Sequence, residues 1–164
     1  MEKKEPEEEV GVIYTLGTGS RTLEEFLRLL KEFRVELVCD VRSFPTSRRF
    51  PHFRKENLEA GLKEAGFDYV WLGRELGGYR KGGYLAYMAT EGFRLGLERL
   101  EEVARRSRTA VVCAERFPWR CHRRFISAAL QDRGWKVIHV VEVDRTWVPS
   151  SVHRGLKEGP RFFD

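Results

Sequence analysis

Amide side chains are almost absent from this chain, in which Asn57 is the one asparagine and Gln131 the one glutamine. Depletion of these thermolabile residues is typical of heat-adapted proteins, so the composition is thermophile-like. No apolar run approaches the roughly 18 residues that a membrane-spanning helix needs, and we expect no membrane contact. Residues 1–9 are mostly acidic and lack the apolar stretch of a secretory or transit signal, so we expect a short disordered tail there.

Cysteine is also scarce: the chain has three, an odd number, at positions 39, 113 and 121. Without an export signal, this pattern predicts reduced thiols in the cytoplasm rather than a disulfide framework. The length of 164 residues predicts one domain. A domain of about 150 residues buries roughly two-thirds of its unfolded surface, which is enough for a core without disulfides or metal.

Basic residues are plentiful, and arginine greatly outnumbers lysine in a chain with a formal net charge of +5. The planar guanidinium suits bidentate binding of phosphate or carboxylate, so an anionic partner is one explanation of the excess. GC-rich codon usage or heat adaptation is the other. Both stay open at this point.

Apolar runs rich in Val, Ile and Leu alternate with helical patterns, which favours a mostly parallel sheet covered by helices on both faces. Thr22 and Glu25 form a capping box that starts the first helix. The expected strands are 10–16, 37–41, 67–72, 109–114 and 136–143, and the other expected helices are 55–65, 91–106 and 120–133. We therefore predict a three-layer α/β domain over residues 10–145 with a five-stranded sheet. An irregular arm, 146–164, would pack on it through Trp147, Phe162 and Phe163.

The unusual residues follow the ends of the strands, where such folds bind ligands. The loop 114–124, after the fourth strand, is the most informative because it contains Cys121 and His122 beside several arginines. We expect both residues in the opening turns of the next helix, where a thiol near Arg120, Arg123 and Arg124 should have a lowered pKa. Cys121 as a packing residue and His122 as a capped or core histidine are the alternatives.

The other two cysteines have simpler explanations. Cys113, at the end of the fourth strand, is either a packing residue or a second thiol. Cys39 lies inside the second strand and is expected in the core. A zinc site from Cys113, Cys121 and His122 is disfavoured, because their spacing matches no standard ligand pairing, and we expect neither metal nor cofactor.

An acid and an arginine share one face of the second strand end, because Asp40 and Arg42 are two residues apart. They form either a catalytic or ligand-orienting pair or a structural ion pair. Glu115 should approach them if the second and fourth strands are neighbours, and a carboxylate there can act as a base or a nucleophile.

The loop 42–54 interleaves arginine with phenylalanine, a combination that suits phosphate contact and base stacking. Arg48 and Arg49 are its central arginines. A solvated loop with its aromatic rings in the core is the alternative. The segment 17–20 (GTGS) before a helix is a weaker anion-binding signal, since neither the full dinucleotide motif nor the Walker A motif is present.

Taken in order, several segments resemble the family called domain of unknown function 488. They are Tyr14-Thr15-Leu16-Gly17, Arg21-Thr22-Leu23-Glu24-Glu25-Phe26, Asp40-Val41-Arg42-Ser43-Phe44-Pro45, Ser47-Arg48-Arg49, Pro51, Leu76-Gly77-Gly78, Cys113-Ala114-Glu115, Pro118 and Cys121-His122-Arg123. The resemblance implies a small α/β protein with a loose link to DNA repair or nucleic-acid processing. One departure is Thr18, where the family typically has histidine. If that histidine is catalytic in relatives, either this protein has lost the catalytic group or His122 does that work alone.

The leading hypothesis is an enzyme acting on a phosphate-bearing substrate, a nucleotide or a nucleic-acid end. The anion-binding residues would be Arg42, Arg48, Arg49 and Arg123, and the reactive groups Asp40, Glu115, Cys121 and His122. The first alternative is a rhodanese-like thiol-transfer enzyme, although a Cys-x5-Arg cradle from Cys113 would need arginine where Trp119 stands. The second alternative is a nucleic-acid-binding module without enzymatic activity.

Overall fold

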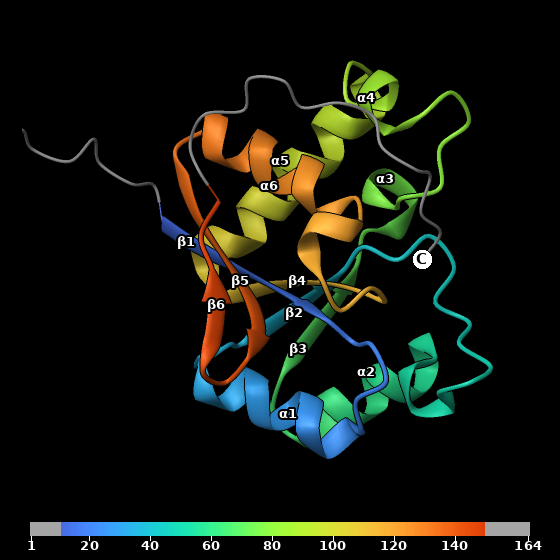
Figure 1. Ribbon diagram of the computed structural model, residues 1–164, viewed down its shortest axis with the longest axis vertical. Coiled ribbons are helices and arrows are strands. Elements are labelled where there is room, and N and C mark those ends of the chain that lie inside the picture. Colours follow the sequence, from blue (N-terminus) through green and yellow to red (C-terminus); the bar gives the residue numbers. More distant parts are fainter. Residues whose placement is uncertain (1–10, 150–164) are drawn as a thin grey trace, which may run out of the picture.

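Six strands form one sheet in the computed structural model, which describes residues 11–149 (Figure 1). The sheet order is β3-β2-β4-β1-β5-β6. The strands are β1 (Gly11–Gly17), β2 (Leu37–Asp40), β3 (Asp68–Trp71), β4 (Thr109–Cys113), β5 (Trp135–Glu142) and β6 (Arg145–Trp147). Every pair is parallel except β5 with β6, which is antiparallel.

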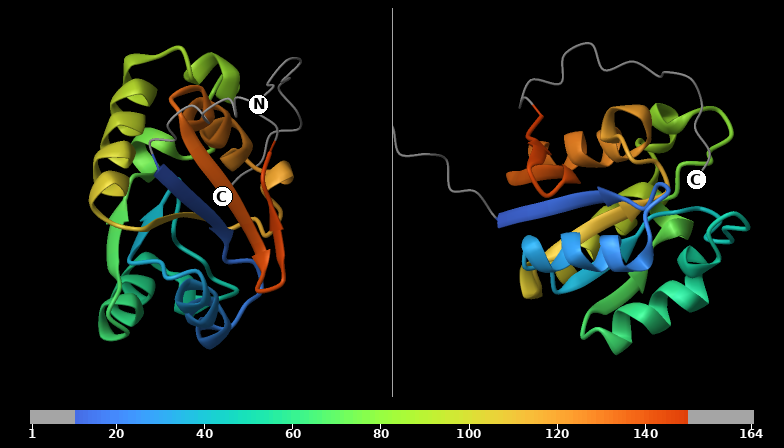
Figure 2. Two further views of the ribbon diagram at one scale, coloured as in Figure 1. Left: turned by 90° about the vertical axis from the view of Figure 1, so that its left-hand side faces the viewer. Right: turned by 60° about the horizontal axis from the view of Figure 1, so that its bottom comes forward.

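Helices cover both faces of this sheet (Figures 1 and 2). One face is covered by α1 (Leu23–Glu32) and α2 (Lys55–Glu64). The other is covered by α5 (Glu91–Arg106) and α6 (Arg123–Asp132), with the short α3 (Gly73–Leu76) and α4 (Tyr84–Tyr87) nearby. Two single 3-10 turns, η1 (Pro51–Phe53) and η2 (Pro118–Arg120), complete the elements. The predicted three-layer α/β fold is confirmed.

The core consists of two hydrophobic clusters, one on each face, because successive strand residues point to opposite sides. On the α5/α6 face, Val111 packs with Leu100 and Ile126. On the α1/α2 face, Val112 packs with Leu30 and Leu58. The sheet therefore separates two groups of side chains that are neighbours in the sequence.

Local sequence signals account for several helix ends. The Thr22 side chain accepts a hydrogen bond from the Glu25 backbone, and Glu25 reciprocates at the Thr22 N–H, so the capping box is confirmed. Gly66 has a φ of 91°, the left-handed conformation that glycine tolerates best, directly after the last turn of α2. The expected helix 91–106 is observed with the same bounds.

Three local differences from the expected elements have a tertiary cause. β6 adds a sixth strand from a stretch too short to show alternation; it forms by pairing with β5. The glycine-rich stretch after β3 contains α3 and α4, each a single helical turn held by neighbouring elements. The last helix begins at Arg123 rather than Arg120, because Arg120 belongs to the 3-10 turn η2, which ends just before Cys121. The expected tail 1–9 and the arm beyond 149, with Phe162 and Phe163, lie outside the described residues.

Candidate functional site

Asp40 and Arg42 form a closed ion pair at the end of β2. Arg42 Nε donates to Asp40 Oδ1 at 2.9 Å, and Arg42 Nη2 donates to Oδ2 at 2.8 Å. Tyr69 donates its hydroxyl to the same carboxylate at 2.6 Å, and Arg42 Nη1 donates to the Phe53 carbonyl at 2.6 Å. Burial opposes the charge of Arg42, but the Asp40 carboxylate raises the arginine's pKa. Both side chains are fully buried and committed to protein partners, which fits the structural ion-pair interpretation.

This pair lies on the α1/α2 face of the sheet, away from the cysteines. Its contacts with Phe53 and Tyr69 belong to the cluster on that face. Cys113 and Cys121 instead pack in the cluster of the α5/α6 face. The structure thus does not gather Asp40, Arg42 and the thiols into one pocket, although β2 and β4 are neighbours as expected.

The second group of polar side chains, on the α5/α6 face, is a dithiol held by one arginine. Cys113 Sγ and Cys121 Sγ lie 3.3 Å apart. Arg123 Nε donates to Cys113 Sγ at 3.0 Å and to Cys121 Sγ at 3.2 Å. The same guanidinium donates to Thr15 Oγ1 at 2.9 Å and to the Glu115 carbonyl at 2.5 Å. Arg123 is 0% exposed. The two cysteine thiols are the groups able to ionise that contact its guanidinium.

These contacts favour the thiolate form of Cys121. Burial alone would raise its pKa, because it disfavours the charged form. The hydrogen bond from Cys113, the Arg123 charge, the neighbouring His122 and the Arg123 backbone N–H act in the opposite direction and lower the Cys121 pKa to about 5. The pKa of Cys39, by contrast, is raised by burial and by the Asp40 charge. Cys39 is fully buried in the core, as expected.

Cys121 precedes α6 instead of lying in its opening turn. Its backbone is extended, with φ −141° and ψ 177°. The sulfur accepts the Arg123 backbone N–H at 3.3 Å, so a free donor of the helix start is directed at the thiol. The expected lowering of its pKa is therefore found, with the Arg123 side chain as a larger contributor than the helix N-terminus.

His122 and Glu115 are close to this centre in sequence but face other partners. His122 is buried, with Nε2 3.0 Å from the Val41 carbonyl and its ring 5.5 Å from that of Tyr84. The Glu115 carboxylate accepts the Phe117 N–H at 3.2 Å and is half-buried. His122 thus connects the loop between β4 and α6 to the backbone carbonyl of Val41, which lies between Asp40 and Arg42.

Of the four predicted anion-binding arginines, only two face solvent. Arg48 and Arg49 are exposed, and Arg49 lies over the Phe50 ring at 5.4 Å. Arg42 and Arg123 are turned inward, as described above. The segment 17–20 is also less open than expected, because the Thr18 N–H donates to the Cys113 carbonyl and the Gly19 N–H to the Ala114 carbonyl.

Two contributors to the dithiol site were missed from the sequence, Thr15 on β1 and His139 on β5. Thr15 Oγ1 lies 2.5 Å from His139 Nδ1, so a hydrogen-bonded chain runs from the sulfur atoms through Arg123 to His139. Burial and the Arg123 charge lower the His139 pKa to about 3, which keeps the ring neutral. Alternation along a strand predicts which face of the sheet Thr15 and His139 occupy. It does not predict that Thr15 contacts Arg123 and His139, because these three residues lie far apart in the sequence.

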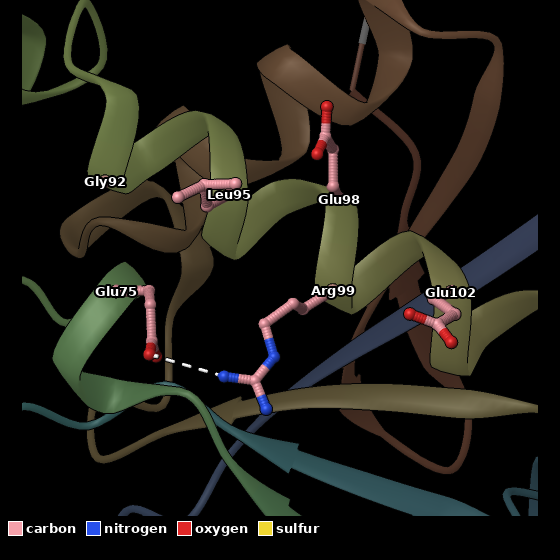
Figure 3. Close-up of a pocket in the computed structure, with 6 residues that line it drawn as sticks. All are labelled: Glu75, Gly92, Leu95, Glu98, Arg99 and Glu102. Atoms are coloured by element: carbon pink, nitrogen blue, oxygen red, sulfur yellow. Dashed lines mark ion pairs between the residues drawn. The ribbon is translucent and has the colours of Figure 1, made fainter.

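Two surface hollows in the described part of the chain lie elsewhere. One, of about 330 Å³, is between α3 and α5, where Glu75 reaches toward Arg99 at 3.6 Å (Figure 3). The other, of about 540 Å³, lies between α2 and β3 and is lined by Tyr69 and charged residues. Within residues 11–149, no group of three His, Cys, Asp or Glu side chains has the arrangement of a metal site. None of the helices described is long and apolar enough to cross a membrane.

A comparison with protein-family models matches most of the chain to one family. The family model described as "Domain of unknown function DUF488" matches residues 22–130. The match includes both Cys113 and Cys121 and excludes β1, so the Thr18 departure falls outside it. Comparisons with curated proteins and with solved structures found no match. Since the matched segment covers well over half of the chain, this protein belongs to the DUF488 family.

Proposed function

We propose that this protein is an enzyme of thiol chemistry in which the Cys121 thiolate attacks a small electrophilic substrate. The observation that carries the proposal is the contact of Arg123 Nε with both sulfur atoms, at 3.0 Å and 3.2 Å. The thiolate is the nucleophilic form of cysteine, and an adjacent guanidinium stabilises it. The sequence spacing argued against thiol transfer, because a Cys-x5-Arg loop that starts at Cys113 would need arginine at the position of Trp119. In this proposal Arg123 supplies that guanidinium from the first position of α6.

Each residue of the centre then has a role. Cys121 is the nucleophile, Cys113 shares a hydrogen bond with it at 3.3 Å, and Arg123 stabilises the negative charge on sulfur. His122 follows the thiol and contacts the Val41 carbonyl through Nε2. Asp40 and Arg42 hold the loop after β2 in place and take no part in the reaction.

Access to the thiols limits the size of the substrate. Cys113 is 1% exposed and Cys121 2% exposed. They stand at the two ends of the loop between β4 and α6, in which residues 114–117 are half-buried and Trp119 and Arg120 are exposed. A small reagent, or a limited opening of this loop, therefore suits the site better than a bulky protein substrate. A reducing compartment keeps both residues as thiols, so we place the protein in the cytoplasm.

Alkylation of the native full chain with iodoacetamide between pH 4 and pH 9 tests the proposal, with peptide mass mapping of each cysteine. Cys121 should be modified with a midpoint near pH 5. Cys39 is the control in the same molecule and should stay unmodified, because burial raises its pKa. A Cys121 midpoint near the ordinary thiol value of about 8.5, or modification only after unfolding, would contradict the proposal.

Binding of single-stranded nucleic acid is a second candidate function, carried by exposed aromatic rings beside arginines. Phe44 and Tyr79 form an edge-to-face pair at 5.7 Å next to the loop of Arg48 and Arg49. A second group, on the loop after β4 and on β6, consists of Phe117, Trp119, Trp147 and Arg145. Such rings stack on bases while arginine contacts the phosphates, so a phosphate-bearing substrate would lie along this surface.

A fluorescent oligothymidylate titrated with the protein tests this candidate. Affinity should fall steeply with salt, and Trp119→Ala should weaken binding about tenfold, the effect of one lost stacking contact. Leu95→Ala is the matched control, since Leu95 is 46% exposed on the outer side of α5. Equal binding by both variants, or binding independent of salt, would remove the candidate.

A further inference from the structure

The two sulfur atoms of the dithiol are close enough to bond after a small movement. They are 3.3 Å apart. A disulfide bond is about 2.05 Å long, so the atoms must approach by roughly 1.3 Å. Cys113 ends β4 and Cys121 follows η2, so the two thiols are attached to opposite ends of one short loop. Movement within that loop can bring them together without displacing the sheet.

Arg123 is placed to assist a reaction at the Cys121 sulfur. Its Nε and its backbone N–H both donate to this atom, at 3.2 Å and 3.3 Å. Those donors hold a thiolate in place and are within reach of an oxygen atom that approaches the sulfur. Charge that develops on the departing oxygen would meet the same guanidinium.

We propose, building on the thiol chemistry above, that a small hydroperoxide oxidises Cys121 and that Cys113 then closes a reversible Cys113–Cys121 disulfide. In the first step the thiolate attacks one peroxide oxygen, the O–O bond breaks, and the departing oxygen takes a proton and leaves as water or an alcohol. Cys121 is then a sulfenic acid. In the second step Cys113 attacks the Cys121 sulfur, the S–O bond breaks, and the hydroxyl leaves with the Cys113 proton as water.

The electrons of this cycle balance with one external reductant. Two sulfur atoms together give two electrons to the peroxide bond. Two equivalents of a small thiol return them and restore the dithiol. Burial selects the oxidant: with Cys113 1% and Cys121 2% exposed, a hydroperoxide of a few atoms can enter where a protein disulfide cannot.

The third cysteine does not take part in the proposed cycle. Cys39 belongs to the same hydrophobic cluster but lies within β2, where burial raises its pKa. A site-specific reaction therefore leaves one thiol, Cys39, in the oxidised chain. General oxidation of the protein would consume it together with the others.

Treatment of the reduced full chain with one equivalent of hydrogen peroxide tests the proposal. The reaction is quenched in acid and the remaining thiols are alkylated after unfolding. We expect loss of the Cys113 and Cys121 thiols, retention of Cys39, and a peptide pair joined between 113 and 121 that dithiothreitol separates. A joined pair between two chains, or loss of Cys39 at the same rate, would overturn the proposal.

Two variants resolve the steps. Cys113→Ser should stop at the sulfenic acid, which dimedone captures at position 121, and Cys121→Ser should lose the fast reaction with peroxide. Circular dichroism checks that each variant is folded. The 113–121 disulfide is detected in the chain without substitutions, so that test does not depend on the folding of a variant. If Cys121 alkylates with a midpoint near pH 5 and peroxide yields no 113–121 bond, this inference fails and the proposed function stands. If Cys121 reacts with neither reagent, both fail.

Discussion

At the scale of single residues, Arg123 connects the polar groups of the dithiol site. Its guanidinium contacts two sulfur atoms, a threonine hydroxyl and a backbone carbonyl, all without exposure to solvent. Arg123→Met removes the positive charge and keeps much of the volume. We expect the Cys121 pKa to rise from about 5 toward the ordinary value of about 8.5, measured as the midpoint of alkylation against pH. Arg120→Met, at an exposed neighbour, is the control and should leave the midpoint in place.

The Asp40–Arg42 pair makes a prediction about stability. Asp40→Asn leaves the Arg42 charge buried without its counter-ion, which typically costs about 3–5 kcal/mol of unfolding free energy. Urea denaturation measures the loss, and Asp144→Asn in the exposed turn between β5 and β6 is the control. A folded Asp40→Asn protein of nearly unchanged stability would contradict the structural role that we assign to the pair.

His139 gives a pH dependence with a definite sign. Its pKa is about 3 in the folded protein and about 6.5 in the unfolded chain, so the unfolded state binds the proton first as pH falls. This contribution to stability is therefore complete above pH 6.5 and is lost between pH 6.5 and 3. From pH 8 to pH 5 the unmodified protein should lose about 2 kcal/mol more than His139→Gln. Urea denaturation at both pH values measures the difference, and parallel curves would show that His139 does not titrate in this way.

At the scale of elements, the loop between β4 and α6 has the two thiol residues at its ends. It crosses the end of β1 so closely that a Cβ on Gly17 would lie 2.0 Å from the Glu115 carbonyl oxygen. Backbone hydrogen bonds from Thr18 and Gly19 fasten the same crossing. Glycine is therefore required at position 17 for close approach of two backbones.

Gly17→Ala should displace this loop and cost about 1–3 kcal/mol, as overpacking usually does. We also expect faster alkylation of Cys121, because its cover is loosened. Gly92→Ala in α5 is the control: its Cβ would meet the end of the Tyr87 side chain at 3.1 Å and Thr90 Oγ1 at 3.9 Å, and stability should stay within about 1 kcal/mol. Unchanged stability and alkylation in Gly17→Ala would mean that the loop accommodates the methyl group elsewhere.

At the scale of the whole molecule, one sheet joins two hydrophobic clusters, and strands contribute alternate residues to both. Leu30→Ala on the α1/α2 face and Leu100→Ala on the α5/α6 face should each cost about 2–5 kcal/mol. Both should keep a single transition that is the same by circular dichroism and by tryptophan fluorescence. Separate transitions in either variant would show that the two faces unfold independently.

The sequence by itself determined the fold class and most elements. Continuous apolar strands, the Thr22–Glu25 capping box and Gly66 after α2 are local signals, and local signals are readable without coordinates. It also identified Cys121 and the arginines around it as candidate site residues. The lowered Cys121 pKa was expected from the nearby arginines, whereas in the structure it depends first on the hydrogen bond with Cys113 and then on the Arg123 charge.

Only the tertiary structure decided which of those residues meet. Asp40 and Cys113 are the last residues of neighbouring strands, yet alternation directs their side chains to opposite faces of the sheet. The partners of Arg123 come from β1, β4 and the loop between β4 and α6, a convergence that depends on strand order. A pattern along the chain gives the face of each residue within its own element, whereas contacts between elements depend on how the chain packs.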